Sequence, residues 1–368
     1  MGDSITNGIG DFYPDDNISL LERFIGARGP QATLIDQLDQ SRPFTPALVY
    51  NEGIGGDETY DAAFVRIDSI LERHPAANRV LIGLGTNDAF TPLQSGLGCT
   101  GAACDGTYKG NLQTLVNRIV WADFPNNTVP SGVAVSIARI PPAWVTSTPW
   151  SSTANNLIRQ YNQVIENEIS NADIGPDFFN YFMPAQATST HRKSMFSDNL
   201  HPNSLGYLVM ATLWHNALVP ESPEPLPFVL EDIKLAVKAE AKQELLTVGS
   251  LYRTTTSHQL TSIPSVLAGG RWIRTPNNTS NGNASYLRFT VDRTVDVYVA
   301  YDGGSTARPN WMQGFVATGL SVGTTDANGP QMKLYVRTYN AGQITLGGNK
   351  ASGSAGSNTN YVTIVVEH

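Results

Sequence analysis

The feature that most constrains the fold is a regular alternation of two kinds of apolar segment over residues 1–219. Short continuous apolar runs, which suit buried strands, alternate with longer segments in which apolar residues recur at helical spacing. This alternation predicts a parallel sheet covered by helices on both faces. We expect strands over 80–84, 132–140 and 178–183, the last of them aromatic, and helices over 17–27, 60–71, 108–122, 154–170 and 204–217.

The pattern changes after residues 220–227, PESPEPLP, which are too rich in proline for helix or sheet. Beyond them, short segments of alternating polar and apolar residues are separated by clusters of glycine, asparagine, serine and threonine, as in a β-sandwich. The clearest segments are 286–291, 295–301, 332–339 and 361–366, and alternation within 231–242 favours a strand over a helix. We therefore expect an α/β domain over 1–219, a linker over 220–227 and an all-β domain over 228–368.

The composition excludes several classes of partner. Charged residues make up 15% of the chain and the net charge is −8, whereas nucleic acids and anionic membranes bind basic surfaces. No apolar run is long enough to cross a bilayer. Abundant small polar residues with little lysine are typical of secreted bacterial enzymes. We expect a secreted or periplasmic protein, although no signal peptide is visible in this chain.

The two cysteines, Cys99 and Cys104, lie in a glycine-rich loop, LGCTGAAC. Two thiols do not complete a zinc site, and no histidine lies within ten positions of them. We expect a small-loop disulfide, which fits an oxidising compartment, with free loop thiols as the alternative.

The chain begins with MGDSITNGIG, in which Ser4 lies at a sharp turn between small residues. A serine hydroxyl is a poor nucleophile unless a base takes its proton and hydrogen-bond donors stabilise the developing oxyanion. A strand is expected immediately before Gly2 to present the serine, and Met1 alone is too short to form it. The rest of the chain must therefore supply a histidine, an acid that orients it and the oxyanion donors.

Residues 198–203, DNLHPN, supply a histidine and an acid just before the last expected helix. Asp198 and His201 are three residues apart, so a turn between them can place the carboxylate against one imidazole nitrogen. The other nitrogen is then left to take the proton of Ser4. The alternative is a helix-capping aspartate beside a surface histidine.

Two glycine-containing turns are candidates for the oxyanion donors. Asn87 follows the expected strand at 80–84, where its side-chain amide can donate to an oxyanion. Gly56 lies in a Gly-Gly-Asp turn, where a backbone N–H without a neighbouring side chain can approach a ligand closely. The alternatives are an ordinary Asx turn and a tight turn that requires positive φ.

Together these segments resemble the SGNH, or GDSL-type, hydrolase family. The resemblance rests on residues 2–6, 51–57, 85–88 and 198–201, which occur in that family's order and spacing. It implies a flavodoxin-like three-layer αβα fold and ester hydrolysis through an acyl-serine, with no cofactor or metal. By this resemblance, Ser4 is the nucleophile, His201 the base and Asp198 the orienting acid. The oxyanion hole is then formed by the backbone N–H groups of Ser4 and Gly56 and the side chain of Asn87.

The resemblance also bears on the substrate. Residues 198–218 look like the end of carbohydrate-directed acetylesterases of this family, and the C-terminal region resembles β-sandwich modules of secreted polysaccharide-active enzymes. We therefore expect removal of short acyl groups, mainly acetyl, from a polysaccharide. The alternatives are a broad short-chain carboxylesterase or lipase-like enzyme and, in a different class, an inactive glycan-binding protein.

Several aromatic and histidine residues are secondary candidates. Trp311 could offer an indole to a sugar ring, and Trp144 and Trp150 could wall a substrate pocket, although packing is the commoner role of such residues. His191 could touch substrate from a polar loop. The C-terminal domain could accordingly bind polysaccharide, stabilise the hydrolase by packing or shape its cleft.

Overall fold

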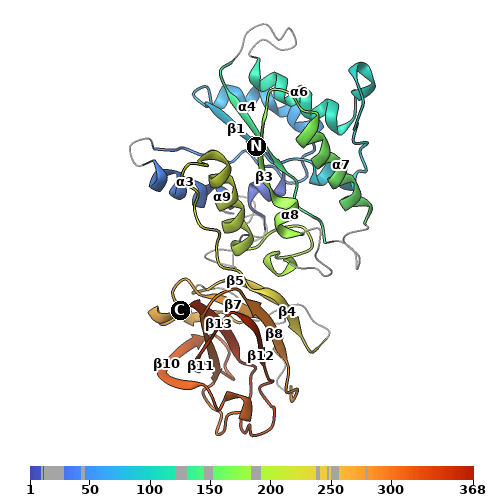
Figure 1. The fold of residues 1–368 in the computed structure, drawn as a ribbon. Helices are drawn as coiled ribbons and strands as arrows, with labels where there is room; N and C mark the ends of the chain where they lie inside the picture. Colours follow the sequence, from blue (N-terminus) through green and yellow to red (C-terminus); the bar gives the residue numbers. More distant parts are fainter. Residues whose placement is uncertain are drawn as a thin grey trace.

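The computed structural model describes residues 1–9, 11, 29–42, 46–121, 131–144, 152–183, 192–237, 241–246, 248–249, 257–277 and 281–368 (Figure 1). The helix expected over 17–27 lies outside these residues, as do Trp150 and His191.

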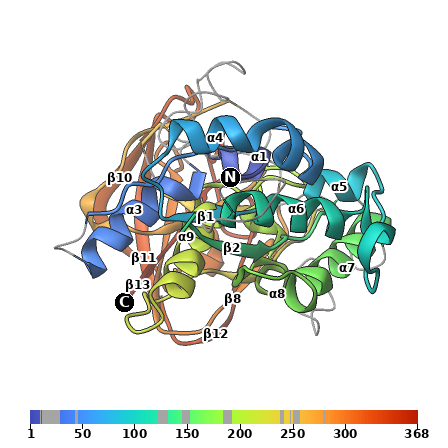
Figure 2. The ribbon, with the colours of Figure 1, turned by 90° about the horizontal axis from the view of Figure 1, so that it is seen from above.

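The N-terminal part is built on a parallel sheet in the order β1-β2-β3, with β1 spanning Arg79–Ile82, β2 Ala134–Arg139 and β3 Asp173–Asp177. Figure 2 shows β1 and β2 between α4 on one side and α9 on the other. The three-layer α/β fold is therefore confirmed. Its helices are α1 (Ser4–Asn7), α3 (Gly29–Ser41), η1 (Asp61–Arg66), α4 (Ile67–Arg73), α5 (Thr86–Phe90), η2 (Gly101–Cys104), α6 (Tyr108–Val120), α7 (Thr153–Asn167), α8 (Phe178–Phe182), η4 (Lys193–Met195) and α9 (Ser204–Leu218).

The main helices begin where side chains satisfy their free N–H groups. Thr107 accepts from the N–H of Gly110 at the start of α6, and Ser152 accepts from that of Asn155 at the start of α7. One face of α6 buries Leu112, Leu115 and Ile119 completely, as their helical spacing predicts.

Residues 178–183 are not the strand that their aromatic content predicts. They form α8, whose first turn is capped by Asp177 through the N–H of Asn180. The strand is instead the preceding segment, DIGPD, which is polar and contains a proline. β3 lies at the edge of the described sheet, where proline is tolerated because one side of the strand needs no partner.

The helix expected over 60–71 begins with a π-helical segment, η1, before the regular α4. Wider π turns shift the buried face, so Ala62 and Ala63 are fully buried. Tyr60 and Phe64, which the spacing places on the apolar face, are instead 54% and 44% exposed. The helix is confirmed, but two of the four residues predicted to face the core, Tyr60 and Phe64, face solvent instead.

The C-terminal part is all-β and antiparallel, as expected. A seven-stranded sheet has the order β5-β7-β13-β9-β11-β10-β6, and a three-stranded sheet has the order β12-β8-β4. Residues 220–227, which precede these strands, form no helix or strand. The strands are β4 (Glu231–Leu235), β5 (Lys242–Leu245), β6 (Leu260–Ser262), β7 (Arg271–Arg274), β8 (Leu287–Val291), β9 (Val295–Asp302), β10 (Val316–Thr324), β11 (Gln331–Tyr339), β12 (Gly342–Leu346) and β13 (Val362–Glu367), with short 3-10 turns at Ser265–Leu267 (η5) and Asn310–Met312 (η6).

Strand β9, in the middle of the large sheet, is buried on both faces. Val297 and Val299 contribute to the core shared with β8 and β12, whereas Tyr298 and Ala300 contribute to a second cluster with Trp272. The period-2 alternation in the sequence therefore marks two apolar faces of one strand. Among the residues that the structure describes, no helix combines the length and apolarity needed to span a membrane.

Candidate active site

Three backbone segments, at Gly2, Gly53 and Gly83, lie side by side, and the polar residues of the site come shortly after them in the sequence. Gly2 forms parallel bridges to both Gly53 and Gly83, so residues 1–2 run between the other two segments. The backbone nitrogen of Met1 donates to the carbonyl of Leu81 at 2.7 Å. Because the three segments run in parallel, the turns that follow them meet at one edge of the sheet. These turns carry Ser4, Gly56 and Asn87.

Ser4 is the first residue of α1 and is 7% exposed. Asp3 caps this short helix by accepting from the N–H of Ile5 at 2.9 Å. Gly2 must be glycine, because a Cβ there would collide with the Thr6 hydroxyl and the carbonyl of Gly83. The Gly-Asp-Ser-Ile-Thr run is thus required locally to place the serine at the sheet edge.

The structure brings His201 and Asp198 to Ser4. His201 Nε2 lies 2.9 Å from Ser4 Oγ, and His201 Nδ1 lies 2.7 Å from Asp198 Oδ2. Asp198 also accepts from the backbone N–H groups of Leu200 and His201 at 2.6 and 2.7 Å. A hydroxyl, an imidazole and a carboxylate are therefore linked in series.

The pKa values of two carboxyl groups near the imidazole are shifted in opposite directions. Partial burial alone would raise the pKa of Asp198, but the hydrogen bonds from the ring and backbone of His201 and from Leu200 lower it to about 2. Burial raises the pKa of Asp3 to about 6, against the N–H of Ile5 and the nearby His201. Asp198 therefore stays ionised beside the imidazole well below neutral pH, whereas Asp3 loses its proton only as the pH rises through about 6.

Asn87 and Gly56 are joined through the residue that follows Gly56. Asn87 Nδ2 donates to the carbonyl of Asp57 at 2.9 Å. Gly56 has φ 90° and is exposed, and no atom of the residues that the structure describes lies within 4 Å of the position that a Cβ would take. The turn at Gly56 is thus held against the start of α5 with its backbone open to solvent.

Asp88, the residue after Asn87, connects the start of α5 to Thr59. It is fully buried and accepts from both the backbone N–H of Thr59 at 3.2 Å and the Thr59 hydroxyl at 2.5 Å. Burial raises the pKa of Asp88 to about 6, although the Thr59 hydrogen bonds oppose this shift. Arg66 of η1 forms an ion pair with Asp57 in the same turn.

A family model of the GDSL-like lipase/acylhydrolase family matches residues 1–209. The chain belongs to this family. No curated protein matches the chain.

Solved structures similar to the chain include three proteins. A catalytic mutant of an acetylxylan esterase from Geobacillus stearothermophilus is 19% identical, with 60% of this chain and 90% of that chain covered and a TM-score of 0.40. A lipase/acylhydrolase from Enterococcus faecalis is 20% identical over 61% of this chain and 96% of that chain, with a TM-score of 0.39. A β-glucuronidase of glycoside hydrolase family 2 is 22% identical over 40% of this chain, with a TM-score of 0.33, and the match spans only 16% of the β-glucuronidase.

The remaining described candidates of this GDSL-like chain make packing contacts or hydrogen bonds within the protein. Trp144 is 2% exposed and packs edge-on against Phe196, and Trp311 donates to the carbonyl of Gly348 and packs against Phe315. Both indoles are therefore packing residues. His215 is fully buried with Nε2 3.0 Å from the Ser41 hydroxyl, so it joins α9 to α3.

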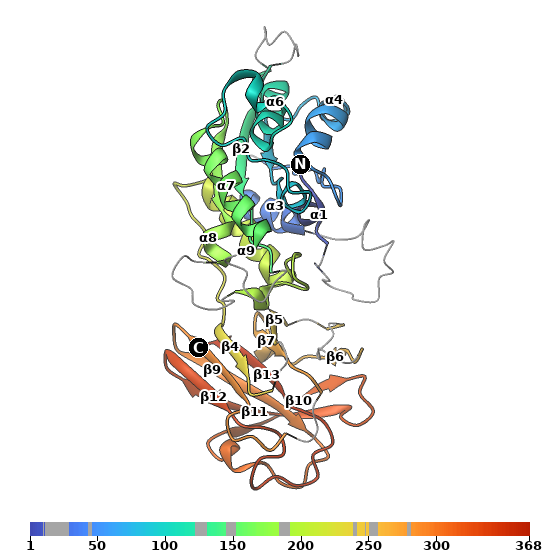
Figure 3. The ribbon, with the colours of Figure 1, turned by 90° about the vertical axis from the view of Figure 1, so that its right-hand side faces the viewer.

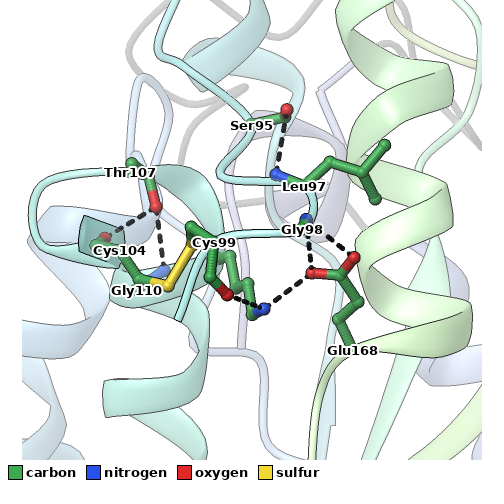
Figure 4. The surroundings of a disulfide bond; sticks show 9 residues. Ser95, Leu97, Gly98, Cys99, Cys104, Thr107, Gly110 and Glu168 are labelled. Atoms are coloured by element: carbon green, nitrogen blue, oxygen red, sulfur yellow. Dashed lines mark hydrogen bonds and ion pairs between the residues drawn. A yellow bond between two sulfur atoms is a disulfide. The ribbon is translucent and has the colours of Figure 1, made fainter. Parts of the chain in front are cut away.

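Cys99 and Cys104 form a disulfide, as expected (Figure 4). Lys109 donates to the carbonyl of Cys99 and forms an ion pair with Glu168, which ties this loop to the end of α7. Within the described ranges, no group of histidine, cysteine, aspartate or glutamate side chains is arranged to hold a metal ion.

A cavity of about 760 Å³ lies beside α1, lined by Asp3, Ile5, Thr6 and Thr86 among others. Ser4, Asp198 and His201 do not line it. Exposure falls along the linked groups, because the Asp198 side chain is 56% exposed, that of His201 is 17% exposed, and Ser4 is 7% exposed.

Sequence reasoning missed three residues that hold the site together: Thr59, Arg66 and Asp3 in its capping role. Thr59 and Arg66 stand in no local sequence pattern, because each is recognisable only through a partner outside its own turn. Thr59 is bonded to Asp88, and Arg66 forms an ion pair with Asp57. An aspartate immediately before a helix-starting serine is a capping signal that the sequence does contain.

Proposed function

We propose that this protein is a serine esterase that hydrolyses short acyl esters, mainly acetyl, on a carbohydrate. Membership of the GDSL-like acylhydrolase family makes the chain an ester hydrolase. The observation that carries the mechanism is the series Ser4 Oγ, His201 Nε2, His201 Nδ1 and Asp198 Oδ2, with successive contacts of 2.9 and 2.7 Å.

In the first half-reaction, Ser4 Oγ attacks the ester carbonyl carbon while its proton passes to His201 Nε2. The tetrahedral intermediate collapses, the C–O bond to the alcohol breaks, and His201 gives its proton to the leaving oxygen. The acyl group is now on Ser4. A water then attacks the acyl-serine with His201 as base, and the proton returns to Ser4 as the carboxylic acid leaves.

Asp198 holds the imidazole in the tautomer that this transfer needs. Its carboxylate accepts from Nδ1, so the lone pair of Nε2 faces the serine hydroxyl. The lowered pKa of Asp198 keeps this carboxylate charged when the imidazole becomes an imidazolium.

The oxyanion is stabilised by three donors in this proposal. The N–H of Ser4 lies in the first turn of α1, where helical N–H groups have no partner within the helix. The exposed turn at Gly56 offers a second backbone N–H. The Asn87 amide carries two N–H groups, of which the bond to Asp57 uses one and fixes the orientation of the other.

The carbohydrate substrate is supported by the likeness of residues 198–218 to acetylesterases acting on carbohydrates and by the exposed rings of Tyr60 and Phe64. These rings pack against each other at 5.0 Å between centroids, just beyond the turn at Gly56. The disulfide supports a secreted location, because such bonds persist in oxidising compartments. We retain the division into domains 1–219 and 228–368 as part of the proposal.

Turnover of p-nitrophenyl acetate by the wild type and by Ser4→Ala tests the reaction. We expect activity in the wild type and its loss in Ser4→Ala, with Ser69→Ala on the exposed face of α4 as a matched control that keeps activity. An inactive wild type would favour a glycan-binding protein.

A second comparison tests the substrate class. Acetate release from acetylated xylan is compared with cleavage of p-nitrophenyl esters of medium-chain acids. Preference for the medium-chain esters would replace the carbohydrate esterase by a broad carboxylesterase or lipase-like enzyme.

A further inference from the structure

The loop that carries Asp198 and His201 is held from two sides. On the side of the α/β core, the N–H of Trp144 donates to the carbonyl of Asn199 at 2.8 Å, and Met195 and Phe196 are fully buried. On the other side, β5 contacts η4 and α9, and Figure 3 shows β4 and β5 at the end of the C-terminal part that faces the α/β part.

The contacts between the loop and the C-terminal part lie at both ends of the loop. At one end, Arg192 forms an ion pair with Glu231 of β4 at 2.9 Å, and its guanidinium lies over the ring of Tyr181. At the other end, Asn203 Nδ2 donates to the carbonyl of Gln243 in β5 at 2.9 Å. The loop is therefore attached to the β region on each side of His201.

Gln243 is the centre of these contacts. Its side chain is fully buried, accepts from the N–H of Leu230 at 2.7 Å, and donates to the carbonyl of Leu230 at 2.7 Å and to the Ser194 hydroxyl at 2.8 Å. The two bonds to Leu230 lie within the C-terminal part, whereas the bond to Ser194 joins that part to the loop. Because a buried amide that loses a partner costs free energy, the bond to Ser194 favours contact between the two parts. Val229 and Leu245, beside them, pack against the core of the α/β part.

The contacts reach His201 through a short path. Asn203 is 1% exposed, caps α9 through the N–H of Gly206, and donates its own N–H to the carbonyl of Met195 at 2.9 Å. Ser197 donates both its N–H and its hydroxyl to the carbonyl of His201. Movement of Asn203 or Ser194 would therefore be passed to the backbone of His201.

We propose that β4 and β5 brace the Asp198–His201 loop and that Gln243 is a positioning residue for His201. The catalytic consequence rests on the proposed function, whereas the brace itself does not. Because misplacing a catalytic group by about 1 Å can cost about 10²-fold in rate, a brace at this loop acts on kcat more than on KM. The C-terminal region is then a working part of the hydrolase rather than an independent module.

The test compares Gln243→Met, which removes the buried amide at similar length, with Asn360→Leu. Asn360 is an equally buried amide of the C-terminal region, bonded to Tyr286 and the carbonyl of Pro276 within the sandwich. Ser194→Ala, which removes one hydrogen bond at a half-buried position, is the milder variant should Gln243→Met fail to fold. Each full-length variant is measured for kcat and KM on p-nitrophenyl acetate, for the rate of Ser4 labelling by a fluorophosphonate, and for amide hydrogen exchange in 192–203.

We expect Gln243→Met to lower kcat and the labelling rate by about tenfold with KM unchanged, and to speed exchange in 192–203. Ser194→Ala should change the same quantities in the same direction by less, and Asn360→Leu should lower only the melting temperature. Equal kcat and equal loop exchange in Gln243→Met and Asn360→Leu would overturn the brace. If the wild type neither turns over nor labels, the proposed function fails, and the loop exchange alone then decides on the brace.

Discussion

His201 Nε2 lies 2.9 Å from Ser4 Oγ, although 197 residues separate the two along the chain. Ser4 comes directly after residues 1–2, which lie between the backbone at Gly53 and the backbone at Gly83. His201 lies on the loop that precedes α9. The contact forms only when the first and last elements of the α/β part pack together, as the fully buried His215 on α9 and Ser41 on α3 do. The contact between the Ser4 hydroxyl and the His201 imidazole is thus coupled to completion of the fold, and so is the nucleophile activation that we propose for it.

Asp198→Asn should lower kcat by about 10³–10⁴-fold while leaving the fold intact. An asparagine can still approach Nδ1, but its amide N–H favours the tautomer that places a hydrogen on Nε2, which then cannot accept the serine proton. Steady-state kinetics on p-nitrophenyl acetate measure the effect. Asp173→Asn, which removes an exposed carboxylate paired with Arg79, is the matched control. Full activity in Asp198→Asn would remove Asp198 from the mechanism.

Asn87→Ala should lower kcat by about 10²–10³-fold with little change in KM, because an oxyanion donor acts mainly in the transition state. Asn117→Ala on α6 replaces an asparagine bonded to Gln113 and serves as the control. A rise in KM with unchanged kcat would instead assign Asn87 to substrate binding.

Sequence patterns predicted the α/β part and the contacts of Ser4, His201 and Asp198 because both depend on local chemistry. The Gly-Asp-Ser run specifies a capped helix start with no room for a Cβ at Gly2, and the Asp198–His201 spacing specifies one turn. The errors occur where tertiary context decides. A polar edge strand, β3, carries no apolar run, and the π turn of η1 changes which residues of a helix face the core.

The contact between Gln243 and Asn203 was also beyond sequence reasoning. Neither residue stands in a pattern, and the pair joins two parts that differ in fold class. A buried amide becomes recognisable only when its partners are known, because glutamine and asparagine are usually surface residues.

Asp3→Asn should stabilise the protein at neutral pH but not in acid. The folded-state pKa of Asp3 is raised to about 6 from an ordinary 3.8 by burial, so the folded state holds this proton more tightly than the unfolded state. Stability from this group is therefore greatest below about pH 4 and falls as the pH rises through about 6. Asparagine keeps the cap without the charge.

Urea unfolding at pH 4 and pH 8 measures this effect. The free energy of unfolding of Asp3→Asn should exceed that of the wild type by up to about 3 kcal/mol at pH 8, since each unit of pKa shift corresponds to about 1.4 kcal/mol. The two proteins should converge near pH 4. The same difference at both pH values would mean that the buried charge is not its cause.

Removing the disulfide should destabilise the protein without affecting the reaction. Cys99 and Cys104 are five residues apart, and closing so short a loop contributes about 2 kcal/mol in the chain-entropy description. The Cys99→Ser/Cys104→Ser double variant should unfold at lower urea concentration and retain the kcat of the wild type. A loss of kcat would show that the loop reaches the site, and reduction of the wild type by dithiothreitol provides an independent check.

The exposed rings of Tyr60 and Phe64 should contribute to binding of carbohydrate but not of small esters. Both residues follow the turn at Gly56, and Thr59, next to Tyr60, is bonded to Asp88 beside Asn87. The π turn exposes two adjacent aromatic rings where regular helical spacing would bury them, and exposed apolar surface beside a reactive site marks a region for ligand contact. Tyr60→Ala/Phe64→Ala should raise KM for acetylated xylo-oligosaccharides by about tenfold, or about 1.4 kcal/mol, and leave p-nitrophenyl acetate kinetics unchanged. Val316→Ala, at an exposed apolar residue of β10, is the control, and an equal loss on both substrates in the double variant would assign the rings to the structure of the turn instead.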